Sequence, residues 1–324
     1  MDIIGAKWIV LVTLFLLTFI FSMLPLKLLK AFHETADPVK RYRYGRIISL
    51  LSCFAAGVFM ATCLLDLFPE VDDILQKAMT SPNINTSFPV AEFTVAFGFF
   101  MVLIVEQIVL DCKESVRRTA DAIESFSDED PDIRRKLRRD SVEGVSDQPQ
   151  LNADENYEDD PHSSFRSFLL LTALSLHSLF EGLAIGLQPD VESVLQIFAA
   201  VVLHKTIIAF SLGLNLVQSQ LGLIAIIRSN VLFCITSPIG MGIAMSLEQF
   251  GHAVDSSGVN GVLQGLACGT FVYITFFEVL PHELNKGKDR LLKLLAVLIG
   301  FSVVCGVLFL EPEKPKSCSA NGPL

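Results

Sequence analysis

The sequence predicts an all-α polytopic membrane protein with eight transmembrane helices. Of its 324 residues, 51% are hydrophobic, and the mean hydropathy is +0.52. The apolar residues form eight long blocks with few charges, whereas a soluble domain spreads them at core spacing. Each block is long enough to cross a hydrocarbon core of ~30 Å at about 1.5 Å per residue. The expected spans are residues 5–29, 47–69, 90–111, 167–187, 193–217, 221–247, 259–281 and 291–310.

The first apolar block, from Ile3 to Leu29, is interpreted as a transmembrane span. It is too long for the apolar region of a signal peptide, and it lacks a basic leader and a small-residue cleavage site.

The charged residues of the short connections predict the orientation of the spans, because Lys and Arg concentrate on the cytosolic side. Basic residues gather between spans one and two and between spans seven and eight: Lys27, Lys30, Lys40, Arg41, Arg43, Arg46, Lys286, Lys288, Arg290 and Lys293. The other short connections are acidic or neutral. This alternation predicts that both termini are extracellular and that the sequon at Asn85 is outside.

The connection between spans three and four, residues 113–165, predicts a cytosolic disordered loop. It alternates acidic and basic runs and has few apolar residues. Phosphorylation of Ser127 or Ser141 would make it regulatory; an unmodified linker is the alternative. The expected domains are therefore 1–112 with spans one to three, 113–165 as the loop, 166–310 with spans four to eight, and 311–324 as an extracellular tail.

Charge and cysteine content exclude two classes of function. The net charge of −10 comes largely from the acidic central loop, and the sequence has no basic patch that would indicate a nucleic-acid partner. The seven cysteines lie mostly inside apolar blocks and form no CxxC pair, so neither a disulfide framework nor a thiolate metal site is expected.

Span four contains two polar residues that hydrocarbon disfavours. His177 and Glu181 are four positions apart, so their side chains share one face of a helix. An imidazole nitrogen and a carboxylate oxygen at that spacing are typical of half of a Zn²⁺ site. The alternative is a hydrogen-bonded pair that joins two helices. Gly182 and Gly186 allow another helix to approach closely.

Span five adds a second polar pair, His204 and Lys205. With His204, three metal ligands (His177, Glu181 and His204) can converge, and a water molecule or a fourth side chain completes a tetrahedron. A buried ammonium needs a partner, and Glu106 of span three or Glu181 itself can provide the carboxylate for Lys205. The ammonium also repels a second cation.

Two further groups of acidic and imidazole side chains stand near the membrane faces. Asp66 and Glu70 are four residues apart at the outer end of span two and predict an entrance for cations. Glu278 and His282 have the same spacing at the inner end of span seven, next to Glu283, and predict an exit. The alternative for each group is a solvated helix end.

These motifs resemble the ZIP (Zrt-, Irt-like) family of metal transporters over essentially the whole chain. The resemblance is greatest to subfamily II, the zinc importers of vertebrate plasma membranes. It rests on three segments, residues 177–186 of span four, 57–62 of span two and 269–278 of span seven.

The resemblance implies inverted repeats, spans one to three against six to eight, around spans four and five. Two-metal relatives have an asparagine and two acids where this chain has Ser178, Lys205 and Ile208. It therefore implies a site for one ion, which is transported as substrate and is not a cofactor. Zinc or a similar divalent cation is the expected partner, and the plasma membrane is the expected location, with endosomal vesicles as the alternative.

Two other classes of function stay open on the residues alone. One is a receptor or scaffold that does not transport, in which the buried charges only join helices. The other is an intramembrane metallohydrolase, but the chain has no HExxH motif, and the residues after His282 lack the second histidine. We therefore expect that the protein is not an enzyme. A homodimer is compatible with such a bundle.

Overall fold

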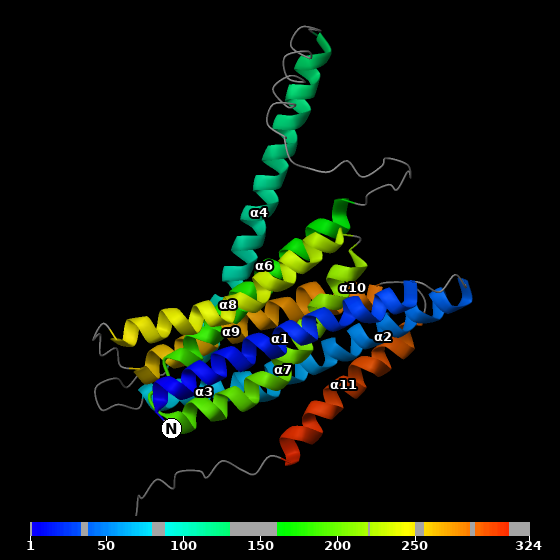
Figure 1. Cartoon of the computed structure of the whole chain (residues 1–324). Helices are drawn as coiled ribbons and strands as arrows, with labels where there is room; N and C mark the ends of the chain where they lie inside the picture. The colour runs from blue at the N-terminus through cyan, green and yellow to red at the C-terminus, as the bar shows by residue number, and fades with distance from the viewer. Residues whose placement is uncertain are drawn as a thin grey trace, which may run out of the picture. The chain divides into compact units, whose positions relative to one another are not determined.

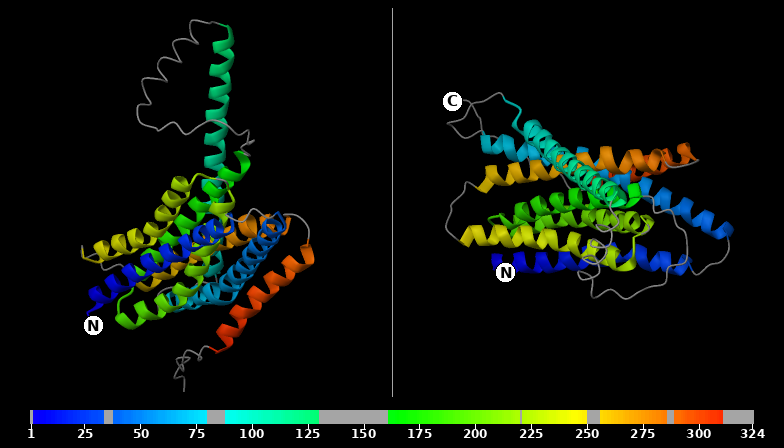
Figure 2. Two further views of the ribbon diagram at one scale, coloured as in Figure 1. Left: turned by 45° about the vertical axis from the view of Figure 1, so that its right-hand side comes forward. Right: turned by 90° about the horizontal axis from the view of Figure 1, so that it is seen from above.

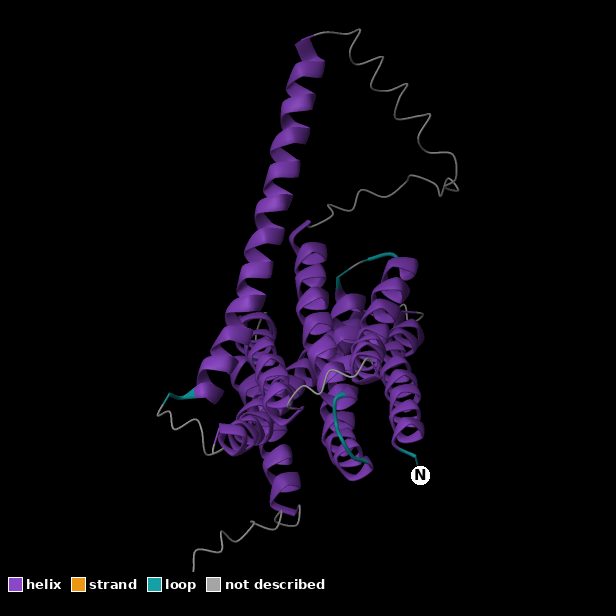
Figure 3. Ribbon diagram, turned by 90° about the vertical axis from the view of Figure 1, so that its left-hand side faces the viewer, coloured by secondary structure: helices purple, strands orange, loops and turns teal. Residues whose placement is uncertain are grey.

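The computed structural model describes residues 2–33, 38–79, 88–129, 161–219, 221–249, 256–285 and 289–310. Every regular element among these residues is a helix (Figure 3). Within the part of the chain that the structure describes, eight stretches are long and apolar enough to cross a membrane, as predicted. In chain order (Figure 1), the elements are α1 Ile3–His33, α2 Pro38–Ala61, η1 Thr62–Leu67, α3 Phe68–Met79, α4 Val90–Glu129, α6 Pro161–Gly186, α7 Val191–Gln218, α8 Leu223–Gln249, α9 Ser256–Tyr273, η2 Ile274–Val279, α10 Leu280–Asn285 and α11 Arg290–Leu310.

The described chain divides into two units, residues 1–102 with 162–324 and residues 103–161. The second unit contains the C-terminal part of α4. We expected disorder from residue 113, but the helix continues to Glu129, so the start of the predicted loop is helical. Oppositely charged side chains at helical spacing, such as Glu114 and Arg118 with 2.6 Å between Oε1 and Nη2, stabilise this extension. Asn85, Ser141, Lys286 and the tail from 311 lie outside the described residues, and the four-domain division stays a prediction.

Two apolar clusters organise the first unit. One joins α1, α6, α7 and α8 through Val10, Ile185, Val201 and Met241, among others. The other joins α3, α4 and α9, with Leu75 in α3. Helix α11 runs along α2 (Figure 2). Spans four and five therefore lie beside spans one and six, and span five also contacts α2.

Close glycine contacts show that spans two and three repeat as spans seven and eight. A Cβ on Gly57 of α2 would overlap the Val297 carbonyl oxygen of α11, and one on Gly269 of α9 would overlap the Val95 carbonyl oxygen of α4. The reverse contacts match as well, Gly300 against Phe54 and Gly98 against Leu266. In lipid, helices associate through such close approach more than through the hydrophobic effect. The packing of one pair of spans is thus reproduced in the other.

A π-helical turn interrupts span two at η1 and span seven at η2. The Phe68 N–H bonds to the Cys63 carbonyl and the Leu280 N–H to the Thr275 carbonyl, each five residues back. A proline follows each turn, and its ring would clash with the carbonyl four residues earlier in a regular α-helix, so a wider turn relieves the crowding. The two segments share residue types at equal spacing: Gly57, Asp66 and Pro69 in the first, and Gly269, Glu278 and Pro281 in the second.

The sequence predicted that glycines would let another helix approach span four, and that helix is α8. A Cβ on Gly182 of α6 would meet the Ser237 carbonyl oxygen, and one on Gly240 of α8 would meet the Leu179 carbonyl oxygen. Pro238 lies between these contacts in α8. This close packing on α8 sets the orientation of α6, and with it the direction in which the side chains of His177 and Glu181 extend.

Candidate metal centre

Helices α6 and α7 bring together the three side chains predicted as metal ligands. The ligand atoms of His177, Glu181 and His204 all lie within 4.8 Å of one another. The three residues are 2%, 7% and 3% exposed. Because His177 and Glu181 are one helical turn apart, α6 supplies two ligands from one face, and α7 supplies the third.

The imidazole of His177 is held so that one nitrogen is left to bind a metal. Its Nδ1 lies 2.9 Å from the Ala267 carbonyl oxygen of α9 and 3.3 Å from Thr270 Oγ1. A carbonyl oxygen only accepts hydrogen bonds, so Nδ1 carries the proton and Nε2 keeps its lone pair. Nε2 is buried and has no hydrogen-bond partner among the described residues. Metal-binding histidines are typically oriented in this way by a carbonyl on the far nitrogen.

His204 and Lys205 share the Glu181 carboxylate. His204 Nε2 lies 2.8 Å from Glu181 Oε1, and its Nδ1 lies 3.1 Å from the Ala200 carbonyl oxygen. The Lys205 ammonium donates to Glu181 Oε2 and lies 3.4 Å from Ser178 Oγ. A metal ion that binds Glu181 and His204 must therefore replace the hydrogen bond between them.

The structure selects between the two carboxylates predicted to pair with Lys205. The ion pair is with Glu181, one of the predicted ligands. The pair buries an ammonium and a carboxylate together, which avoids the cost of several kcal/mol for an isolated buried ion. Glu106 belongs to the second unit, and its place on a transport route stays a prediction.

Two phenylalanines from the repeated segments form a wall against the histidines. The Phe271 ring stacks on His177 with 4.8 Å between centroids, and it lies 6.1 Å from the His204 ring. Phe59 packs on Phe271 at 5.4 Å. These two residues occupy equivalent positions, two after Gly57 and Gly269, so the two repeats meet beside the candidate ligands. The wall makes the site apolar on that side, which strengthens electrostatic interactions there.

One acidic residue of the predicted entrance and one of the predicted exit lie on the repeated π-helical segments, and the others lie on the helices that follow. Asp66 in η1 and Glu70 in α3 are partly exposed. Glu278 in η2 accepts from Arg166 Nε at 3.3 Å. Glu283 in α10 is 1% exposed.

Polar groups of α2 and α11 surround Glu283. The Ser49 hydroxyl lies 3.3 Å from its Oε2, and the Lys293 ammonium donates to its backbone carbonyl at 2.8 Å. His282 stands one turn after Glu278, as expected. The exit residues are thus tied to several helices, and their role in transport stays a prediction.

Sequence reasoning did not single out four residues that the structure places at a candidate site residue or buries inside a span. Arg166 pairs with Glu278 and stands immediately before the predicted start of span four, where a basic residue borders an apolar block. Thr270 and Phe271 lie inside a motif that we identified without separating their roles. Lys7 is the one basic residue in the first half of span one and is only 1% exposed. The sequence feature that could have identified Lys7 is a single charge inside an apolar block.

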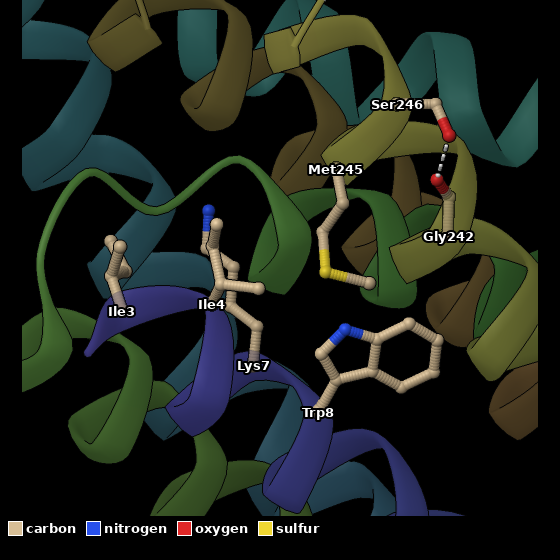
Figure 4. Close-up of a pocket in the computed structure, with 7 residues that line it drawn as sticks. All are labelled: Ile3, Ile4, Lys7, Trp8, Gly242, Met245 and Ser246. Carbon is tan, nitrogen blue, oxygen red and sulfur yellow. Dashed lines mark hydrogen bonds between the residues drawn. The ribbon is translucent and has the colours of Figure 1, made fainter. Parts of the chain in front are cut away.

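A separate cavity of about 440 Å³ lies between α1 and α8 (Figure 4). The Trp8 indole lies beside the Met245 side chain, and the Ser246 hydroxyl donates to the Gly242 carbonyl oxygen at 2.8 Å. None of the predicted ligands lines this cavity. The candidate ligands lie instead on α6 and α7, where their side chains contact one another.

The comparisons with known proteins agree with this architecture. A family model described as ZIP Zinc transporter matches residues 4–308. The chain belongs to the ZIP family. Zinc transporter ZIP1 of Takifugu rubripes is 40% identical over 301 residues, which cover 93% of this chain and 96% of that protein.

Two human relatives are also similar over most of their length. Zinc transporter ZIP1 of Homo sapiens is 36% identical over 308 residues, 93% of this chain and 90% of the relative. Zinc transporter ZIP3 of Homo sapiens is 34% identical over 318 residues, 94% and 98% of the two chains. Because this family and these relatives are transporters, the enzyme alternative is set aside, and zinc transport is supported.

Proposed function

We propose that this protein imports zinc into the cytosol through a single-ion site formed by His177, Glu181 and His204. The observation that carries the proposal is the convergence of their ligand atoms within 4.8 Å of one another, together with a buried His177 Nε2 that has no hydrogen-bond partner among the described residues. Two imidazole nitrogens and one carboxylate oxygen suit Zn²⁺, which prefers four-coordinate sites with such ligands. Three protein ligands leave one position for water, as in exchangeable zinc sites.

In this proposal Lys205 keeps the site reversible. Its ammonium and an incoming zinc ion compete for the Glu181 carboxylate, and the two cations repel each other. The ion therefore binds less tightly than the same three ligands would hold it without a neighbouring ammonium. Ser178, which lies within 3.4 Å of the ammonium, gives Lys205 a second acceptor when zinc occupies Glu181.

The repeated segments support a route through the site. Asp66 and Glu70 would receive the ion on the extracellular side, and Glu278, His282 and Glu283 would release it to the cytosol. Glu106 is proposed as a further cation contact. The α6–α7 pair carries the ligands, whereas the entrance and exit lie on spans two and seven, so movement of the pair relative to those spans would alternate access.

The proposed direction depends on topology. We propose a plasma-membrane location with both termini outside, from the basic connections and from the relatives named as zinc transporters. An antibody should reach a tag at either terminus on intact cells. A tag near residue 140 should become accessible only after permeabilisation. The reverse labelling pattern would overturn the assigned direction.

Uptake of ⁶⁵Zn²⁺ by cells that express the full chain tests the metal site. His177→Ala, Glu181→Ala and His204→Ala should each abolish saturable uptake at equal surface expression. Thr172→Val is the matched control, because Thr172 lies on the same helix and its hydroxyl donates to the Phe168 carbonyl oxygen of that helix. Near-normal uptake by His204→Ala would remove α7 from the site.

Competition with other divalent cations tests selectivity in the same assay. Histidine ligands favour zinc over manganese, so unlabelled Mn²⁺ should compete less well than Zn²⁺ or Cd²⁺. A wild-type protein without saturable uptake of any of these cations would favour the receptor or scaffold alternative.

A further inference from the structure

Arg166, the first residue of span four, binds η2 in two ways. Its Nε lies 3.3 Å from Glu278 Oε2, and its Nη2 donates to the Glu278 backbone carbonyl oxygen at 3.1 Å. The Arg166 side chain is 26% exposed and that of Glu278 is 10% exposed. The planar guanidinium thus holds both the carboxylate and the main chain of the same residue.

This contact joins the helix that carries two candidate ligands to the helix that carries the proposed exit. His177 and Glu181 follow Arg166 on α6, whereas Glu278 belongs to the second repeat. Any displacement of α6 along or away from span seven must break or rearrange the Arg166–Glu278 pair. The pair therefore opposes the relative movement that release of an ion toward this end would require.

The same arrangement of charges occurs at two points along the proposed route. Lys205 pairs with the Glu181 carboxylate in the metal centre, and Arg166 pairs with the Glu278 carboxylate at the exit. In both cases a side chain on the α6–α7 pair presents a cation to an oxygen that could accept a divalent ion. At each oxygen, the basic side chain supplies the positive charge that a bound divalent ion would otherwise supply.

We propose that Arg166 is an exit latch, a tethered cation that holds Glu278 until zinc competes for that carboxylate. The inference rests on the proposed function, that the α6–α7 pair carries the ion. The inference adds Arg166 as a positioning residue. Arg166 controls when the Glu278 carboxylate can bind the ion, and so when the end of the route opens. Glu278 changes its partner from a guanidinium to a divalent cation, and no covalent step is involved.

Thiol labelling of the purified full-length protein tests the latch. Leu170→Cys places a reporter one turn from Arg166 at a position that is 2% exposed. Added Arg166→Gln should speed labelling of this cysteine about fivefold or more, the lower end of usual coupling between conformational states. Arg166→Lys keeps the charge and should label more slowly than Arg166→Gln. Glu278→Gln breaks the same pair from the other side and should also speed labelling.

Native residues provide the controls, with modification of each cysteine measured by mass spectrometry. Cys234 is buried and should stay unlabelled, which excludes unfolding, and the exposed Cys112 should react equally in all variants. Arg118→Gln removes an exposed arginine from an ion pair on α4 and should leave the reporter unchanged. Labelling of Arg166→Gln at the parent rate, or of Arg166→Lys at the Gln rate, would overturn the charge-based latch.

Addition of Zn²⁺ separates this inference from the proposed function. Zinc should speed labelling in the Leu170→Cys parent and have no further effect in Arg166→Gln. Equilibrium dialysis of ⁶⁵Zn²⁺ against the same samples measures binding independently. Normal zinc binding with unchanged labelling would reject the latch alone. Absence of zinc binding would reject the metal site. In that case, faster labelling of Arg166→Gln would still show that the Arg166–Glu278 pair keeps the Leu170→Cys position closed.

Discussion

Replacement of Lys205 by methionine is the most informative perturbation of the metal centre. Methionine keeps most of the length of the lysine stem and removes the ammonium. In the structure the ammonium is bound to Glu181 Oε2, and the two residues are 2% and 7% exposed. Lys205→Met therefore leaves the Glu181 carboxylate buried with His204 as its remaining polar contact among those described.

The expected magnitude follows from that burial. Removal of one partner from a buried ion pair typically destabilises a protein by about 3–5 kcal/mol, because the other charge stays uncompensated. Since both residues are almost fully buried, we expect a value in this range for Lys205→Met in the presence of a chelator. Glu181→Gln should cost a comparable amount, because it leaves the ammonium without its carboxylate.

Zinc should reverse part of this loss only where Glu181 is present. A zinc ion supplies the missing positive charge, so Lys205→Met should bind zinc more tightly than the parent and be stabilised by it. In uptake, KM should fall, and the maximal rate should fall as well, because a tightly held ion leaves slowly.

Unfolding in mixed micelles with increasing dodecyl sulfate measures the free energies of the parent, the two single variants and the double variant. The double-mutant cycle should give a coupling energy of about 2–3 kcal/mol, at the upper end for contacting residues. Strictly additive losses would refute the ion-pair reasoning. Weaker zinc binding by Lys205→Met would refute competition for Glu181 and would mean that the lysine positions the carboxylate for the metal.

Three further outcomes are expected from other parts of the chain. Gly57→Ala and Gly269→Ala should lower the yield of folded protein to a similar degree, whereas Gly306→Ala, with open space around the added methyl, should behave like the parent. Thr270→Val removes a contact to the ligand histidine of α6 and should weaken zinc binding roughly tenfold, measured by equilibrium dialysis. Hydrogen bonds from the backbone and side chain in the first turn of α7 lower the pKa of Asp190 below its usual 3.8. Its capping contribution is therefore complete above about pH 4 and lost as the pH falls through the lowered pKa, and thermal unfolding of Asp190→Ala should lose this acid dependence.

The spans and the shared face of His177 and Glu181 could be predicted because each depends on spacing within one helix. Long apolar blocks fix which residues cross the bilayer, and a separation of four residues places His177 and Glu181 on one face. Helix ends were less accurate. The predicted second span stops at residue 69, whereas the helical run reaches Met79, since charged residues at i,i+4 such as Asp73 and Lys77 continue a helix outside hydrocarbon.

Contacts between helices could not be predicted from spacing alone. Two carboxylates were candidates for Lys205, because one sequence gives no distance from span five to span three or to span four. The structure selects Glu181 of span four. Arg166 was overlooked for a related reason. It stands at the border of an apolar block, where a basic residue normally reports only orientation, and its partner Glu278 is far away in the chain.

The internal repeat explains why the basic residues on α6 and α7 matter for direction. Span two packs on span eight as span seven packs on span three, down to equivalent glycine contacts, and each π-helical turn carries one acid, Asp66 or Glu278. Packing that is equal in both repeats favours neither end of the route. A preference between two states must then come from residues outside the repeat. Lys205 and Arg166 are such residues, because both lie on the central pair of spans. Lys205 binds Glu181 within that pair, and Arg166 binds Glu278 of the second repeat. Substitutions at these two positions should therefore change the balance between states more than equivalent changes within the repeats.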